Sequence, residues 1–258
     1  MIKEIIKIIQ ELSSPSYVVN ETTSKDGVNG SVVAYVDKTS HIAEQYRILR
    51  TNLYSLSAEK PVKTIAITSS QSNEGKTTTA CNLSITLSWD TKKKVVLIDA
   101  DLRKPNVHEM LNLPRKPGLS DLILEKVKPE TFFEKPAIGN LYVIPSGSTV
   151  TNPAELLSYS SFKTLLEVLK SKFDYIVFDT PPTLSVADSS IIGSVCDGVL
   201  LIVKAEVTSR EIVSEAFNLL KNAQAKPIAS VLTNFHAPTY YYFKYKNYYS
   251  YLYKSKKI

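Results

Sequence analysis

TIAITSSQSNEGKTT, residues 64–78, joins an apolar run to a loop that contains Gly75, Lys76 and Thr77. Residues 64–68 are typical of a buried strand, and residues 76–89 favour a helix. A strand that enters a helix through such a loop has the form of a P-loop, whose successive backbone N–H groups bind phosphate at the helix N-terminus. The stretch therefore predicts a phosphate site.

The side chains of this loop suit a nucleotide with Mg²⁺. Gly75 permits close backbone approach, Lys76 would neutralise the β- and γ-phosphates, and the Thr77 hydroxyl is a hard oxygen ligand for magnesium. Taken alone, a chance Gly-Lys-Thr at a helix start is the alternative. The residues expected to bind the nucleotide are Ser72, Asn73, Glu74, Gly75, Lys76, Thr77 and Thr78.

Two further apolar runs end in carboxylates. Residues 95–99 end in Asp99 and are followed by Asp101, and residues 175–179 end in Asp179. The carboxyl ends of parallel strands meet at one edge of a sheet, where ligands bind. The three carboxylates are therefore expected beside the phosphate loop, which disfavours a chance motif.

The alternation of strands and helices continues through most of the chain. Further strands are expected at residues 141–144, 199–203 and 228–233, and further helices near residues 119–125, 162–171, 187–195 and 210–223. Repeated strand–helix units indicate an α/β fold of the P-loop NTPase type. This fold is a doubly wound, mostly parallel sheet with helices on both faces.

The ends of the chain differ from this region. Residues 1–12 have the spacing of an amphipathic helix, residues 13–35 are rich in linker-forming residues, and a second helix is expected over residues 41–57. The predicted division is an N-terminal helix and linker (1–37), a P-loop domain (38–236) and a Tyr-rich tail (237–258).

Composition excludes several classes of protein. The 258 residues are 43% hydrophobic, and no apolar run reaches the length of about 18 residues that a membrane span needs. There is no secretory signal pattern, and Cys81 and Cys196 cannot form a disulfide framework or a zinc site. A cytoplasmic protein is therefore expected.

The net charge of +6 comes from the C-terminal part. Residues 216–258 contain seven lysines and no acidic residue, so residues 1–215 hold 24 basic and 25 acidic side chains. Interleaved tyrosines and lysines could stack on bases, but the tail lacks Arg and Gly and follows a complete ATPase-like region. No nucleic-acid partner is expected.

These motifs together resemble the bacterial tyrosine kinases that regulate capsule and exopolysaccharide synthesis. The resemblance covers about residues 40–258. It is carried by the phosphate loop, the Asp99-Ala-Asp101-Leu-Arg103 run, the FDTPP segment around Asp179 and the Tyr-rich end. Ser72-Asn73 stands where many members of the family have Pro-Gly.

The resemblance implies ATP and Mg²⁺ as cofactors. The implied catalytic residues are Lys76, Asp99, Asp101 and Asp179, and the implied metal residues are Thr77, Asp99 and Asp179. Asp101 would accept or orient the proton of the incoming tyrosine, but which aspartate is the base stays open. Arg103 positions phosphate or substrate, or forms a structural ion pair. Asn234 contacts adenine or caps a turn.

Partners are implied in the same way. A homo-oligomeric ring would form through Glu44, Arg47 and Arg50, and a separate transmembrane activator of the polysaccharide copolymerase type would hold the protein at the inner face of the cell membrane. A cognate phosphotyrosine phosphatase would reset it. The tyrosines implied to be phosphorylated in trans are Tyr240, Tyr241, Tyr242, Tyr245, Tyr248, Tyr249, Tyr251 and Tyr253.

The alternative is a regulatory ATPase of the partition and positioning type, without tyrosine kinase activity. Such proteins share the P-loop fold, but their loops carry a signature lysine where this chain has Gln71.

Overall fold

The computed structural model describes residues 9–13, 24–59, 61–90 and 92–235. Their seven strands form one sheet in the order β1-β7-β6-β2-β5-β3-β4, and all neighbouring pairs are parallel. The strands are β1 (Ile9–Ser13), β2 (Thr64–Ser69), β3 (Val95–Asp99), β4 (Leu141–Ile144), β5 (Tyr175–Asp179), β6 (Gly198–Lys204) and β7 (Pro227–Phe235).

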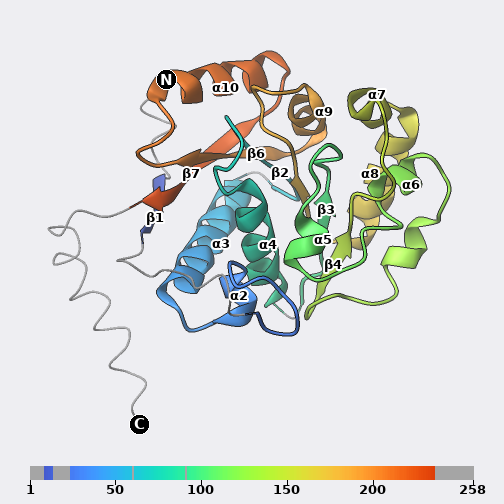
Figure 1. Ribbon diagram of the computed structural model, residues 1–258, viewed down its shortest axis with the longest axis horizontal. Helices are drawn as coiled ribbons and strands as arrows, with labels where there is room; N and C mark the ends of the chain where they lie inside the picture. The colour runs from blue at the N-terminus through green and yellow to red at the C-terminus, as the bar shows by residue number, and fades with distance from the viewer. Residues whose placement is uncertain (1–8, 14–23, 60, 91, 236–258) are drawn as a thin grey trace, which may run out of the picture.

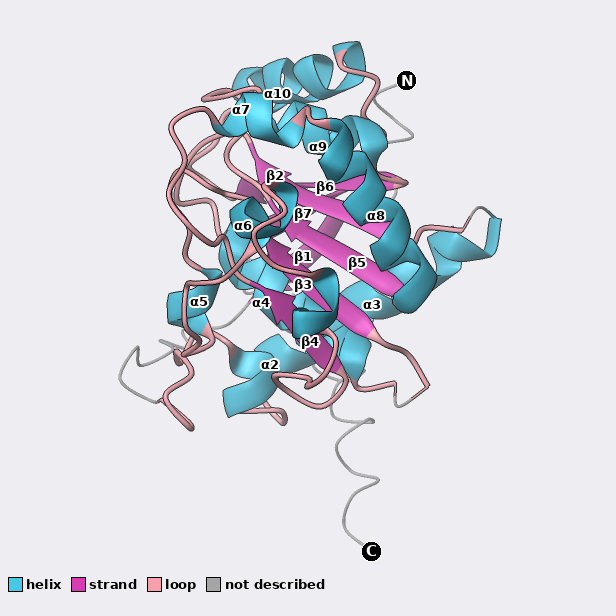
Figure 2. Cartoon of the chain, turned by 90° about the vertical axis from the view of Figure 1, so that its right-hand side faces the viewer, coloured by secondary structure: helices cyan, strands magenta, loops and turns pink. Residues whose placement is uncertain are grey.

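Helices cover both faces of this sheet. Figure 1 shows α3 and α4 on one face and α9 and α10 on the other, and Figure 2 shows α8 beside α9. The helices are α2 (Val33–Val36), α3 (His41–Glu59), α4 (Lys76–Ser88), α5 (Val107–Met110), α6 (Leu119–Ile123), α7 (Pro153–Leu157), α8 (Ser160–Lys172), α9 (Asp188–Val195) and α10 (Arg210–Asn222), with a 3₁₀ turn η2 (Pro129–Phe132).

The near-continuous apolar strands supply two cores. Successive side chains of a strand point to opposite faces, so Ile65 and Ile67 of β2 pack toward α3 and α4, while Ala66 packs in the opposite core. Strands buried on both faces favour apolar residues at successive positions, which explains the lack of polar alternation in β3, β5 and β6. The fold class expected from the sequence is confirmed.

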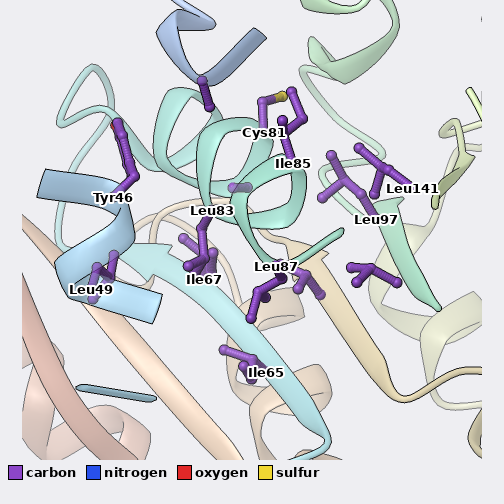
Figure 3. Packing of buried hydrophobic residues seen from close by; sticks show 14 of the residues in the cluster. Tyr46, Leu49, Ile65, Ile67, Cys81, Leu83, Ile85, Leu87, Leu97 and Leu141 are labelled. Atoms are coloured by element: carbon purple, nitrogen blue, oxygen red, sulfur yellow. The ribbon is translucent and has the colours of Figure 1, made fainter. Parts of the chain in front are cut away.

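Helix α4 holds the phosphate loop in place. From Thr79 to Ser88 its side chains are all buried, because α4 is packed between the sheet and helices α2 and α3. Figure 3 shows Leu83 and Leu87 of α4 close to Ile65 and Ile67 of β2. Since the loop connects β2 directly to α4, two rigid elements set its position.

The elements predicted between residues 41 and 235 are confirmed to within two residues at each end. The short elements α5, α7 and η2 were not expected. The N-terminal helix prediction is wrong where the structure describes it, because residues 9–13 form strand β1, which pairs with β7. Residues 1–8 lie outside the described residues.

Packing against the domain begins before residue 38. Val28, Val32 and Ala34 are buried in the core beside α3 and α4. The Asn82 side chain of α4 accepts a hydrogen bond from the Ala34 N–H at 2.8 Å and donates one to the Ser31 carbonyl at 2.9 Å. Part of the stretch interpreted as a linker is therefore an integral layer of the domain.

No helix within the described ranges is both long and apolar enough to cross a membrane.

Candidate functional site

The phosphate loop runs from the end of β2 to Gly75. Asn73 and Gly75 have positive φ angles of 62° and 93°, a left-handed conformation that glycine adopts without strain. Helix α4 begins at Lys76, so its first N–H groups lie at the end of this loop. Left-handed turns followed by a helix N-terminus make an anion-binding concavity. The loop therefore has the backbone conformation of a phosphate-binding loop.

Lys76 lies beside the carboxylates that the sequence predicts for this edge. Its Nζ is 3.0 Å from Asp101 Oδ2, and both side chains are largely buried. Burial on its own would lower the lysine pKa, but Asp179 and Asp101 reverse this and leave the pKa raised. Lys76 is therefore a permanent cation at the start of α4.

Asp99 and Asp179 end neighbouring strands and lie opposite each other in the sheet register. Both are fully buried. Burial, followed by the nearby Asp179, raises the pKa of Asp99 well above its ordinary value. Burial also raises the pKa of Asp179 to about 6, although the charge of Lys76 opposes the rise. Two buried carboxyl groups so close to each other favour a cation.

The hydrogen bonding of this pair tests whether magnesium fits. The Val107 N–H donates to Asp99 Oδ2 at 3.1 Å, but Asp99 Oδ1 and both carboxyl oxygens of Asp179 are buried without hydrogen-bond partners. Unpaired buried oxygens are costly, and Mg²⁺ takes oxygen ligands. Among the described residues no three His, Cys, Asp or Glu side chains converge as a metal site, but Mg²⁺ usually keeps water and phosphate ligands. These donors fit magnesium.

Arg103 forms an ion pair with Asp188. Its Nε and Nη2 donate to the two carboxylate oxygens at 2.9 and 3.1 Å, and the Asp188 side chain is fully buried at the start of α9. Of the two roles that the sequence left open, this structure shows the ion pair. The Lys104 N–H donates to Asp101 Oδ1 at 3.0 Å. Together these contacts fix the loop that carries Asp101.

The other predicted nucleotide residues are arranged around the loop. Ser72 and Asn73 are exposed on it, Thr78 is half-buried one position after Thr77, and Asn234 is exposed at the end of β7 with a φ of 54°. Glu74 differs from these, because its side chain is buried and contacts the protein. The sequence places Glu74 in the phosphate loop but does not indicate that its side chain points into the protein.

Glu44, Arg47 and Arg50 lie on α3, away from this edge. Arg47 forms an ion pair with Glu44 and donates a hydrogen bond to the Lys38 carbonyl. Its guanidinium lies 5.1 Å from the centre of the Trp89 ring. Arg50 donates to the Thr86 carbonyl at 3.0 Å, near the C-terminus of α4. All three side chains are half-buried, and their role in an oligomer stays a prediction.

Arg47 also lines a hollow of about 410 Å³ beside Trp89, and a second hollow lies over α10; neither is at the phosphate loop. The eight predicted phosphorylation sites, Tyr240 to Tyr253, lie outside the described residues.

A parallel α/β sheet with this loop, lysine and carboxylate rim defines a P-loop phosphotransferase or ATPase. Residues 62–233 match a family model described as an AAA domain. Tyrosine-protein kinase YwqD of Bacillus subtilis is 38% identical over 202 residues, which are 78% of this chain and 85% of the relative. Putative tyrosine-protein kinase CapB of Staphylococcus aureus is 33% identical over 79% of this chain and 91% of its own.

The chain is also similar in structure to the solved kinase domain of the Escherichia coli tyrosine kinase ETK. It superposes with a TM-score of 0.76 at 26% identity, over 82% of both chains. The chain belongs to the family of bacterial tyrosine-protein kinases. It is a nucleotide-binding transferase that acts on protein tyrosine, which decides against the alternative of a positioning ATPase without this activity.

Proposed function

We propose that this kinase transfers the γ-phosphoryl group of Mg-ATP to tyrosines in the C-terminal tail of a neighbouring copy, and thereby regulates capsular or exopolysaccharide synthesis and export. The observation that carries the proposal is the grouping of Lys76 with Asp99, Asp101 and Asp179 at the end of the phosphate loop. In phosphoryl transfer, catalysis is mainly positioning and charge stabilisation, for which a lysine, a metal and a carboxylate suffice.

Each side chain has a role that follows from its position. Lys76 would bind the β- and γ-phosphate oxygens, and Thr77, Asp99 and Asp179 would hold magnesium directly or through water. Bound Mg²⁺ neutralises charge that develops on the phosphate oxygens. The backbone N–H groups of residues 72–78 would orient the phosphates, and Asn234 would contact adenine.

Asp101 is the carboxylate that we assign to the tyrosine hydroxyl. Asp99 and Asp179, which end neighbouring buried strands and whose pKa values burial raises, suit the metal. Asp101 is paired with Lys76 in this structure. Once Lys76 binds phosphate, Asp101 would be free to accept a hydrogen bond from a tyrosine, whose pKa near 10 makes it a poor nucleophile without such help.

The tail is suited to be the substrate by its composition. It places eight tyrosines between positions 240 and 253, and residues 216–258 carry seven lysines and no acidic residue. A positive segment is attracted to an acidic rim, and each phosphotyrosine adds about −1.5 to −2 charges near neutral pH. Phosphorylation of several tyrosines would therefore reverse the charge and favour release.

The proposal includes three partners. Copies of the chain assemble in a ring through α3, a separate transmembrane protein of the polysaccharide copolymerase type activates the kinase at the inner face of the membrane, and a cognate phosphatase removes the phosphates. Family membership supports the activator at a general level, whereas the ring and the phosphatase rest on the family resemblance of the sequence alone.

A mixing experiment tests transfer in trans. Full-length Lys76→Met chain, which keeps the tail, is mixed with active chain truncated after residue 236, and tail phosphorylation is followed by mass spectrometry with Mg-ATP. Phosphotyrosine is expected on the Lys76→Met chain. A Lys76→Met chain with all eight tail tyrosines changed to phenylalanine is the matched control. Absence of phosphate from the Lys76→Met chain, with the truncated chain active on an added tyrosine peptide, would contradict the proposal.

A further inference from the structure

Glu74 is the member of the phosphate loop whose side chain is turned into the protein. It is only 2% exposed, although glutamate is almost never fully buried without partners. Its Oε2 accepts a hydrogen bond from the Gln71 N–H at 3.0 Å, so the carboxylate closes the loop on itself. Within the described ranges no basic side chain lies within ion-pair distance of Glu74. Among the described residues, the partners of its carboxyl oxygens are hydrogen-bond donors.

Its second oxygen is bound by a residue far away in the sequence. The Thr208 hydroxyl donates to Glu74 Oε1. Thr208 belongs to the turn between β6 and α10, and its own N–H donates to the Lys204 carbonyl at 3.0 Å. The turn is therefore itself fixed to the end of β6. The carboxylate of Glu74 links this turn to the phosphate loop.

A second threonine reaches the same part of the loop from β7. The Thr233 hydroxyl donates to the Glu74 carbonyl at 2.7 Å. A Cβ atom added to Gly75 would lie 3.3 Å from the Thr233 methyl group, so β7 also packs closely against Gly75. Thr233 pairs with Lys204 across the β6–β7 ladder. Thr208, in the turn after β6, and Thr233, near the end of β7, therefore both lie at the carboxyl-end edge of the sheet.

We infer that Thr208 and Thr233 are positioning residues that act through Glu74 to hold the phosphate loop in its binding conformation; the inference rests on the proposed ATP site at Lys76. Glu74 and Gly75 immediately precede Lys76, so these contacts fix the backbone where the anion-binding N–H groups start. A loop ordered before binding does not have to be ordered by the ligand, which strengthens affinity. Neither threonine contacts the reacting atoms.

The inference predicts a defect in nucleotide affinity rather than in turnover. Thr208→Val keeps the shape of the side chain and removes the hydroxyl. We expect the Kd for Mg-ADP, measured by titration calorimetry, and the KM for ATP to rise about tenfold, the effect of losing one hydrogen bond to a charged group. The kcat at saturating ATP should stay within about twofold, because Lys76 and Asp101 remain. Thr208→Ser should restore both constants, and Thr233→Val should reproduce the defect.

Ser209→Ala is the matched control. Ser209 follows Thr208 and accepts a hydrogen bond from the Ile212 N–H at the start of α10, so its loss loosens the same turn without touching Glu74. Parental affinity is expected. Equal weakening by Ser209→Ala, or parental affinity in both Thr208→Val and Thr233→Val while Lys76→Met is impaired, overturns the positioning role alone. Equal Mg-ADP binding by Lys76→Met and the parent overturns the ATP site and the positioning role together.

Discussion

At the site, one lysine is surrounded by three carboxyl groups that the sequence places on two different strands and a loop. Their convergence could be predicted, because residues after the carboxyl ends of parallel strands share one edge. The Lys76–Asp101 pair at 3.0 Å could not be predicted, because Asp99 or Asp179 could equally have been the partner of Lys76. The Glu74 contacts with Thr208 and Thr233 also left no local signal, since more than 130 residues separate the partners.

Lys76→Met is expected to reduce tyrosine phosphorylation at least about 100-fold, the scale on which loss of one transition-state electrostatic partner acts. The methionine matches the length of the lysine stem but supplies no charge to the phosphates. Phosphotyrosine formation on an added peptide measures the effect, and circular dichroism checks the fold. Lys63→Met, at the opposite end of β2, is the control and should be fully active. Undiminished activity in a folded Lys76→Met protein would contradict the assignment.

Arg103→Leu is expected to lower the free energy of unfolding by about 2 kcal/mol, because it leaves the buried Asp188 carboxylate without its bidentate partner. The value is below that of a fully buried pair, since the Arg103 side chain is 41% exposed. Urea denaturation measures it. Lys104→Leu, an exposed neighbour on the same loop, should change the unfolding free energy by less than about 0.5 kcal/mol. Equal stability of the two variants would show that the ion pair contributes nothing.

At the level of elements, strongly patterned segments were predictable and short ones were not. The bounds of β3, β4 and β5 follow directly from their apolar runs. Helices α5 and α7 span four or five residues, which is too short for a 3.6-residue period to be visible. The isoleucines before residue 10 have helical spacing, but pairing with the edge of β7 determines the structure of β1. Local sequence does not encode such a distant partner.

Asp197 shows how one carboxylate fixes the start of β2. Its Oδ2 accepts hydrogen bonds from the Lys63 and Thr64 N–H groups at 3.0 and 2.8 Å and from the Thr64 hydroxyl at 2.8 Å. Burial would raise its pKa, but these hydrogen bonds outweigh burial and lower it. Because the folded-state pKa lies below the unfolded one, the stabilisation is present above the unfolded pKa. It is lost as the pH falls through the folded-state pKa.

Asp197→Asn should therefore reduce the free energy of unfolding by about 1 kcal/mol at pH 7, a value reduced for solvent screening because the side chain is only partly buried. The difference from the parent should stay constant down to about pH 5 and shrink below about pH 4. Thermal or urea unfolding across this pH range measures it. A difference that grows on acidification would have the wrong sign and contradict the pKa assignment.

For the whole molecule, α3 is the element that would join copies in the proposed ring. Glu44, Arg47 and Arg50 already make contacts inside the chain, so an assembly has to use the parts of these side chains that stay exposed. A head-to-tail contact of this kind closes into a ring when its rotation allows. The sequence could suggest this face through family resemblance, but one chain cannot reveal its neighbour.

Arg47→Ala/Arg50→Ala is expected to shift the size distribution toward the monomer, measured by light scattering at matched concentration. Because Arg50 also binds the Thr86 carbonyl, Arg50→Ala alone should lower the free energy of unfolding by about 1 kcal/mol. Comparing single and double variants separates this internal contact from assembly. An unchanged size distribution, for a parent that does assemble, would rule out the α3 interface.

Trp89, which lies beneath the side chains of Lys38 and Arg47, can serve as a natural fluorescent reporter of assembly. Trp89 is the only tryptophan in the chain, and Lys38 and Arg47 lie 5.6 and 5.1 Å from its ring centre. Indole emission depends on nearby charge and water, so covering this half-exposed face should shift the emission to shorter wavelength. Emission recorded during dilution would then follow ring dissociation without any label, and Arg47→Ala should abolish its concentration dependence.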